Sequence, residues 1–177
     1  MANQSHFAVL FSLLLLIGSC TVEAQRRRGR VPRTSAISQS TLSFETGLVL
    51  RSGDVKPVAR GTFNLLDTSL EKILADSGFS SDLSAFALNS IQSRIDRLRG
   101  ATVTSFDREM DAIKPHIVSS TTTDFSGKGQ FPAVKPGIYY VMYLGEVGPN
   151  TILWNVKVDL KPGQNSVTLD NNNLASP

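Results

Sequence analysis

The sequence predicts an α+β domain that is mainly β, a seven-stranded β-sandwich with a helical segment inserted between the second and third strands. Two observations support this. Short runs of β-branched and aromatic residues alternate with clusters of Gly, Pro, Asn and Asp, which is typical of a small sandwich. Within residues 67–117 the hydrophobic period changes from two to 3.6, which indicates amphipathic helices.

The predicted domain occupies residues 44–170. Its strands are expected at 46–51, 58–66, 118–124, 129–131, 138–144, 151–160 and 166–169. Strand 151–160 alternates apolar and polar residues from Trp154 onward, as expected when one face meets water. Strand 138–144 is apolar or amphipathic on both faces, so we expect one face to meet the opposing sheet and the other to meet the helices.

Two turns flank the short strand 129–131. Asp124 is placed to accept hydrogen bonds from the backbone that follows it, and Gly127 supplies a positive φ. Pro136 and Gly137 suit a type II turn that leads into strand 138–144, with a positive φ at Gly137.

Three helices are expected within the insertion. They are predicted at about 68–78, 81–100 and 104–114. The first has the spacing of a capping box from Thr68 to Glu71, and Gly78, Gly100 and Pro115 end the three helices in turn. The second helix carries an apolar stripe of Leu83, Phe86, Ala87, Ile91, Ile95 and Leu98. Helices this short are unstable alone, so we expect them to dock on the sandwich.

The strand and turn pattern at 121–144, with the segments 47–50, 58–66 and 154–169, resembles two families. These are the carboxypeptidase-regulatory-like domains and the collagen-adhesin B-type repeats. Both are prealbumin-like (transthyretin-like) sandwiches, so the resemblance implies a prealbumin-like Greek-key β-sandwich. Some adhesin repeats contain a Lys–Asn isopeptide bond. The first predicted strand here has no lysine, so we expect no such bond.

Residues 1–24 are predicted to be a signal peptide, because Phe7–Ile17 is an apolar run of signal-peptide length. Two processing sites stay open: a bacterial lipoprotein signal that ends before Cys20, which would then be lipidated, and ordinary cleavage after Ala24. Both predict an exported protein that is periplasmic, outer-surface or extracellular, with a lipid anchor in the first case. Because Cys20 is the one cysteine, no disulfide is expected in the folded part.

Residues 25–43 are predicted to be a basic and Ser/Thr-rich linker, and 171–177 a disordered tail. The linker contains Arg26, Arg27, Arg28, Arg30 and Arg33. Without these five of the 18 basic residues, and without Glu23 of the 15 acidic ones, 13 basic residues face 14 acidic ones. We interpret the arginines as a tether that can contact an anionic membrane surface or polysaccharide. Nucleic acid is a weaker partner, because no aromatic side chain lies among the arginines.

Candidate catalytic groups are few. His116 is the single histidine of the predicted domain and is expected to meet carbonyls at a helix end. Asp107 and Asp111 suit a solvated helix face better than acid/base chemistry. Asp124 with Ser126 suits a turn cap better than a calcium loop. We therefore expect no cofactor and no metal site.

Tyr139 and Tyr143 share one face of strand 138–144, and two alternatives stay open for them. They form either the dock for the helices or an exposed platform for a ligand, whereas Trp154 is expected in the core. The sequence predicts an exported, non-catalytic binding or assembly module at the bacterial cell surface or in the periplasm, with an unknown protein or glycan partner. The alternative is a carbohydrate-binding module that uses exposed tyrosines, and a hydrolase that uses His116 is the least favoured reading.

Overall fold

The computed structural model describes residues 39–176. The predicted signal peptide, both processing sites, Cys20 and the five linker arginines lie outside the described residues. Their roles stay predictions.

Nine strands and three α-helices follow one another along the described chain. The strands are β1 (Ser40–Val49), β2 (Val55–Lys56), β3 (Thr62–Leu66), β4 (Ile117–Thr122), β5 (Lys128–Val134), β6 (Gly137–Val147), β7 (Asn150–Leu160), β8 (Gly163–Asp170) and β9 (Leu174–Ser176). The helices are α1 (Leu70–Asp76), α2 (Leu83–Leu98) and α3 (Ser105–Ile113), with 3₁₀ turns η1 (Lys114–His116) and η2 (Asn171–Asn173).

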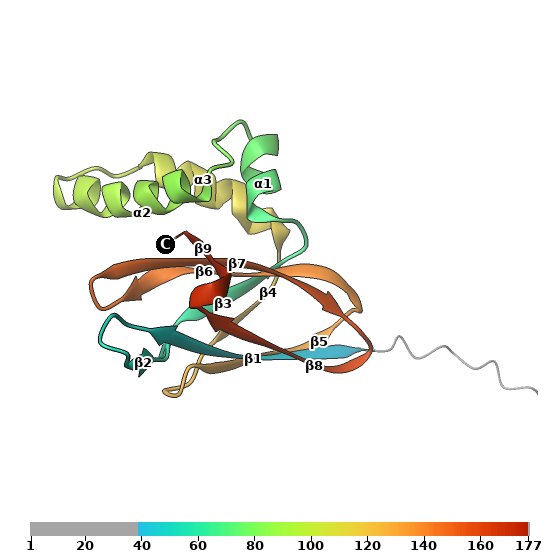
Figure 1. Ribbon diagram of the computed structural model, residues 1–177. Helices are drawn as coiled ribbons and strands as arrows, with labels where there is room; N and C mark the ends of the chain where they lie inside the picture. The colour runs from blue at the N-terminus through green and yellow to red at the C-terminus, as the bar shows by residue number, and fades with distance from the viewer. Residues whose placement is uncertain (1–38, 177) are drawn as a thin grey trace, which may run out of the picture. The chain divides into compact units, whose positions relative to one another are not determined.

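Two sheets form the sandwich (Figure 1). In the first, β1 pairs antiparallel with β2 and β5, and parallel with β8. In the second, the order is β4-β3-β6-β7-β9, and every pairing is antiparallel. β2 and β9 are short additions to seven longer strands. The expected fold class, a mainly β α+β sandwich with inserted helices, is confirmed.

The two sheets enclose an aromatic core. Phe44 from β1 lies 4.8 Å from Phe63 of β3, measured between ring centroids, and Phe63 stacks on Tyr143 at 4.5 Å. Trp154 is fully buried beside them, and its indole Nε1 donates to the carbonyl of Asp170 at 3.0 Å. The expected core position of Trp154 is confirmed.

The helices form a second core on the outer face of the five-stranded sheet (Figure 1). Leu74 of α1, Phe86 of α2 and Ile113 of α3 are buried against Met142 of β6 and Leu153 of β7. The helices lie between the end of β3 at Leu66 and the start of β4 at Ile117, close to the expected insertion at 67–117. The prediction that they dock on strand 138–144 is confirmed.

The first strand begins earlier than expected. β1 starts at Ser40, inside the predicted linker, and ends at Val49, so the prediction of a strand at 46–51 is wrong in its bounds. Ser40 is fully buried, and its hydroxyl donates to the carbonyl of Lys161 at 2.8 Å. This hydrogen bond lets a serine occupy a core position that the hydrophobic pattern does not reveal.

The predicted disordered tail is also wrong as far as Ser176. Asp170 and Asn173 form a capping box around η2, and Leu174–Ser176 forms β9 on the edge of β7. The side chain of Asn171 accepts from Val49 N at 2.7 Å and donates to Val49 O at 3.0 Å. The asparagines that suggested a frayed end therefore bind the backbone of the sandwich instead.

Gly137 at the start of β6 has a positive φ of 155°, as expected. This is far from the φ of about 80° that a type II turn requires, so the expected turn type is wrong. Nearby, Ala133 has a φ of 56° where the register of β5 on β1 shifts. A bulge at this point accounts for the unusual conformation of an alanine.

Candidate functional site

The two candidate tyrosines lie on the inner face of β6. Tyr143 is 6% exposed, and its ring lies 5.7 Å from that of Trp154. Burial raises the pKa of the Tyr143 hydroxyl, and the charge of Glu146 adds to the effect. Tyr139 is half-buried and packs against the same core. The two tyrosines therefore form neither the helix dock nor an exposed platform, and both alternatives are corrected.

The helices dock on the other face of β6. Met142 is buried in the helical core, and Tyr140 and Leu144 pack against it. Because strand 138–144 is apolar on both faces, alternation alone could not show which face meets the helices.

His116 has a structural partner. Its Nδ1 lies 2.9 Å from Oδ1 of Asp67, and the backbone N–H of Asp67 donates to the His116 carbonyl at 3.1 Å. The ring thus meets a carboxylate at the end of β3, and not the helix-end carbonyls that were expected. Both side chains are substantially exposed to solvent. The pair joins the end of β3 to the turn before β4.

Asp124 caps the turn between β4 and β5, as expected. Its Oδ1 accepts from Lys128 N at 2.9 Å and from both the backbone and the hydroxyl of Ser126 at 2.8 Å. The bond from Lys128 N is the main cause that lowers the pKa of the Asp124 carboxyl. Within residues 39–176, no three His, Cys, Asp or Glu side chains are grouped to hold a metal ion.

Asp107 and Asp111 also have structural partners. Asp107 completes the capping box of α3 by accepting from Thr104 N at 2.7 Å, and bonds from Thr104 lower its pKa. Asp111 pairs with Lys114 at 2.6 Å on the helix surface. The expected surface role of both is confirmed.

A groove lies between α2, the β6–β7 hairpin and the end of β1. Its volume is about 610 Å³. We call it the α2 groove. Its lining residues are Leu48, Val49, Leu50, Arg51, Ser84, Ala87, Leu88, Ile91, Val147, Pro149, Asn150, Thr151, Ile152, Asn171 and Leu174.

The α2 groove combines a buried base with an exposed apolar rim. Val147 and Ile152 at its base are at most 9% exposed, whereas Val49 and Leu88 on opposite rims are 51% and 64% exposed. Arg51 is the one charged residue among those that line it. Exposed apolar side chains around a concave surface are typical of a site that binds an apolar group.

Both walls of the α2 groove are held in place. On one side, Asn171 ties the end of β1 to η2 through its two bonds with Val49. On the other, the N-terminal half of α2 is anchored by Leu83, Phe86 and Ala87, which are all buried. Asp82 caps this helix by accepting from Ser84 N at 2.9 Å. The groove is therefore built from ordered elements.

The sequence prediction missed the groove because Leu88 lies beside the predicted stripe of α2 and Val49 lies at a strand end. An apolar residue off the stripe was the available signal. The stripe itself is wrong beyond Ile91, since Ile95 and Leu98 are 38% and 90% exposed. There the buried position is Ser93, whose hydroxyl lies 2.8 Å from that of Thr104. This hydrogen bond turns a polar face of α2 toward the start of α3.

A larger hollow of about 850 Å³ lies over β1, β5 and β8. Its exposed lining residues include Glu45, Lys128, Gln130 and Thr168, which are all polar. It offers hydrogen bonds but no exposed apolar anchor. The α2 groove is therefore the stronger candidate.

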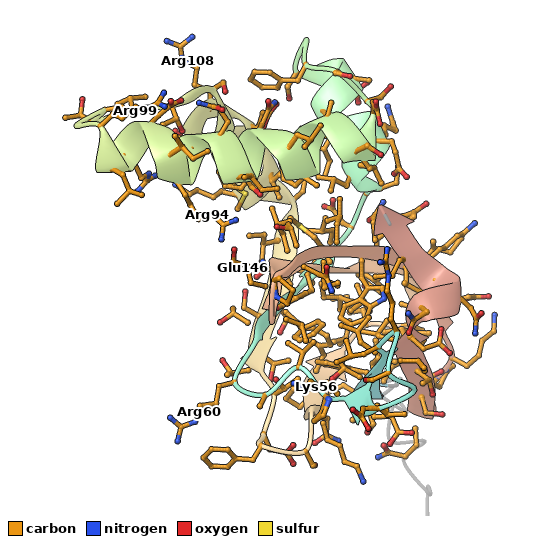
Figure 2. The ribbon with its side chains drawn as sticks, turned by 60° about the vertical axis from the view of Figure 1, so that its left-hand side comes forward. Lys56, Arg60, Arg94, Arg99, Arg108 and Glu146 are labelled. Atoms are coloured by element: carbon orange, nitrogen blue, oxygen red, sulfur yellow. The ribbon has the colours of Figure 1, made fainter. Side chains whose placement is uncertain are left out.

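The far half of α2 carries arginines. Arg94 forms an ion pair with Glu146 of β6, and the two side chains face one another between helices and sandwich (Figure 2). Arg99, which follows the last residue of α2, and Arg108 of α3 point away from the sandwich (Figure 2). Arg97 pairs with Asp107.

Among the described helices, none has the length and apolar character needed to cross a membrane.

No protein-family model and no curated protein matches the chain. Among solved structures, it is similar to a Pseudomonas aeruginosa protein described as a candidate carbohydrate-binding protein, with 14% identity, TM-score 0.42, and coverage of 76% of this chain and 90% of that one. It is similar to a minor pilin of Streptococcus agalactiae, with 16% identity, TM-score 0.42, and coverage of 75% and 44%. It is similar to a basal pilin of Lactobacillus rhamnosus GG, with 11% identity, TM-score 0.36, and coverage of 76% and 95%. At these values the similarities carry no argument about function.

Proposed function

We propose that this protein is an exported, non-catalytic binding or assembly module that holds a partner protein in the α2 groove. The observation that carries the proposal is the apolar rim of the groove, where Val49 and Leu88 are more than half exposed on two ordered walls. Apolar side chains so placed lose contact with water when a partner covers them, which favours association by about 25 cal/mol for each Å² buried.

The proposed location at the bacterial cell surface or in the periplasm is supported by the apolar run Phe7–Ile17. The arginines of the linker support a further contact with an anionic surface. If Cys20 is lipidated, that surface is the membrane that holds the lipid anchor, a few residues from the arginines. A glycan partner has less support, since Tyr143 and Trp154 are buried and pack against each other at a tilt within the core.

A cross-linking experiment in cells tests the proposal. A photo-crosslinking amino acid replaces Leu88 on the rim of the groove, and in a matched control it replaces Phe125. Phe125 is 73% exposed on the β4–β5 loop and is not part of the groove lining. We expect one discrete protein adduct from position 88 that is absent from position 125, and that Val49→Asp weakens. The same adducts from both positions, or none from position 88, would refute the proposal.

A further inference from the structure

Among the described residues, one edge of β7 has no paired strand where it enters the α2 groove. β6 pairs with β7 along its whole length, from Asn150 to Leu160. On the other side, β9 pairs with β7 at Leu153 and Trp154. No described strand pairs with Asn150–Ile152 on that side. In an antiparallel ladder, alternate residues direct their N–H and C=O groups away from a given neighbour, so this segment presents backbone groups to the open side.

The open edge and the groove coincide. Asn150, Thr151 and Ile152 are themselves lining residues of the groove, with α2 on one side and the end of β1 on the other. A strand added here has side chains that alternate between the two walls. One set meets Ala87, Leu88 and Ile91 of α2, and the other meets Leu48 and Val49 of β1. Three residues of β7 span roughly 10 Å, which accommodates three or four residues of an added strand.

β9 sets the direction of such a strand. Its residues advance from Leu174 to Ser176 while their partners on β7 step back from Trp154 to Leu153. A strand that continues in this direction runs antiparallel to β7 past Ile152 and toward Asn150. β9 lies beneath α2 (Figure 1), and its first residue, Leu174, is one of the residues that line the groove. An added strand would therefore extend a ladder that β9 has already begun.

The charge of the groove favours a ligand that carries an acidic group. Arg51 is its one charged lining residue, and no Asp or Glu lines it. An acidic group on the added strand would find a cation and meet no carboxylate. Apolar side chains in alternation would cover Leu88 and Val49 at the rims.

We infer that the α2 groove binds an extended peptide segment of a partner protein by strand addition to the open edge of β7, with alternating apolar side chains and an acidic residue near Arg51. This inference rests on the proposed function, because it names the form in which the partner enters the same groove. Main-chain hydrogen bonds supply affinity in this mode of recognition, and alternate side chains supply specificity.

Random hexapeptides displayed on phage are a suitable probe. They are selected on the purified protein and counter-selected on Leu88→Glu, a variant at an exposed position where a carboxylate should not disturb folding. We expect the selected peptides to alternate apolar residues and to carry an acidic one. The synthetic peptide should bind Leu88→Glu at least tenfold more weakly, and should bind the matched variant Leu98→Glu within twofold of wild type.

N-methylation of alternate amides in the selected peptide removes its hydrogen-bond donors on one edge. We expect one of the two methylation patterns to abolish binding, and hydrogen exchange at 150–152 to slow when the unmodified peptide binds. Strand addition is refuted if no peptide is enriched against Leu88→Glu, or if both methylated peptides bind as well as the parent. If strand addition is refuted but position 88 still gives the cross-link, the proposed function stands. If peptides bind as added strands but position 88 gives no cross-link in cells, the proposed function is refuted and strand addition is not.

Discussion

Replacing Leu74 with alanine tests whether the helical layer and the sandwich unfold as one unit. Leu74 of α1 is fully buried in the helical core. The substitution removes three buried carbons, which costs about 2.4 kcal/mol in transfer free energy, and the remaining cavity raises the total to about 3 to 5 kcal/mol. At a denaturant slope of about 4 kcal/mol/M in guanidinium chloride, the unfolding midpoint should fall by about 1 M.

The chain offers a probe on the other side of the sheet. Trp154 is the sole tryptophan and lies in the sandwich core, so its fluorescence reports on the sandwich and not on the helices. We expect its unfolding curve to shift by the same amount as the far-UV circular dichroism of the helices. Leu98→Ala is the matched control, because Leu98 is 90% exposed and its loss should cost less than about 0.5 kcal/mol. An unchanged Trp154 transition, with helical signal lost separately at lower denaturant, would show that the layer is a detachable unit.

Two further changes probe charge. Glu109 is 4% exposed, and its Oε1 accepts a hydrogen bond from Asn89 at 2.8 Å. Its Oε2 has no partner within the described residues. Burial therefore raises the pKa of the Glu109 carboxyl above the ordinary 4.5. Stability is therefore lost as pH rises from 4.5 through the raised pKa. Glu109→Gln should raise the melting temperature at pH 7 and flatten the pH dependence of the melting temperature above pH 4.5. A lower melting temperature of this variant at pH 7 would contradict the prediction. Replacement of the five arginines in 26–33 by glutamine should weaken salt-sensitive binding to anionic vesicles without changing the melting temperature. If the wild-type chain does not bind such vesicles, the arginine-rich segment is only a spacer.

Local signals predicted the helices well. Asp82 and Thr104 cap α2 and α3, close to the helix starts expected at about 81 and 104, because a cap depends on residues two or three positions away. The first helix is off by one residue, since Ser69 and not Thr68 caps it by accepting from Lys72 N at 3.3 Å. The insertion could be predicted because a change of period is visible in a short window.

Features that depend on distant residues could not be predicted. Ser40 is buried because of a carbonyl 121 residues away at Lys161. The α2 groove needs the bonds between Val49 and Asn171, which are 122 residues apart. The exposure of Leu88 depends on where α2 lies over the sheet, and no local pattern records that position.

The parallel pairing of β1 with β8 has a consequence for the order of folding. It joins residues more than 120 positions apart, from Ser40 with Gly163 to Gly47 with Asp170, and its partners lie near opposite ends of the domain. Non-local pairing of this kind slows folding, because a long chain must be ordered before the contact is rewarded. A chain that has not yet reached residue 163 leaves one side of β1 without its partner. The first sheet is therefore completed late, and until then β1 is an unpaired edge that other chains can bind.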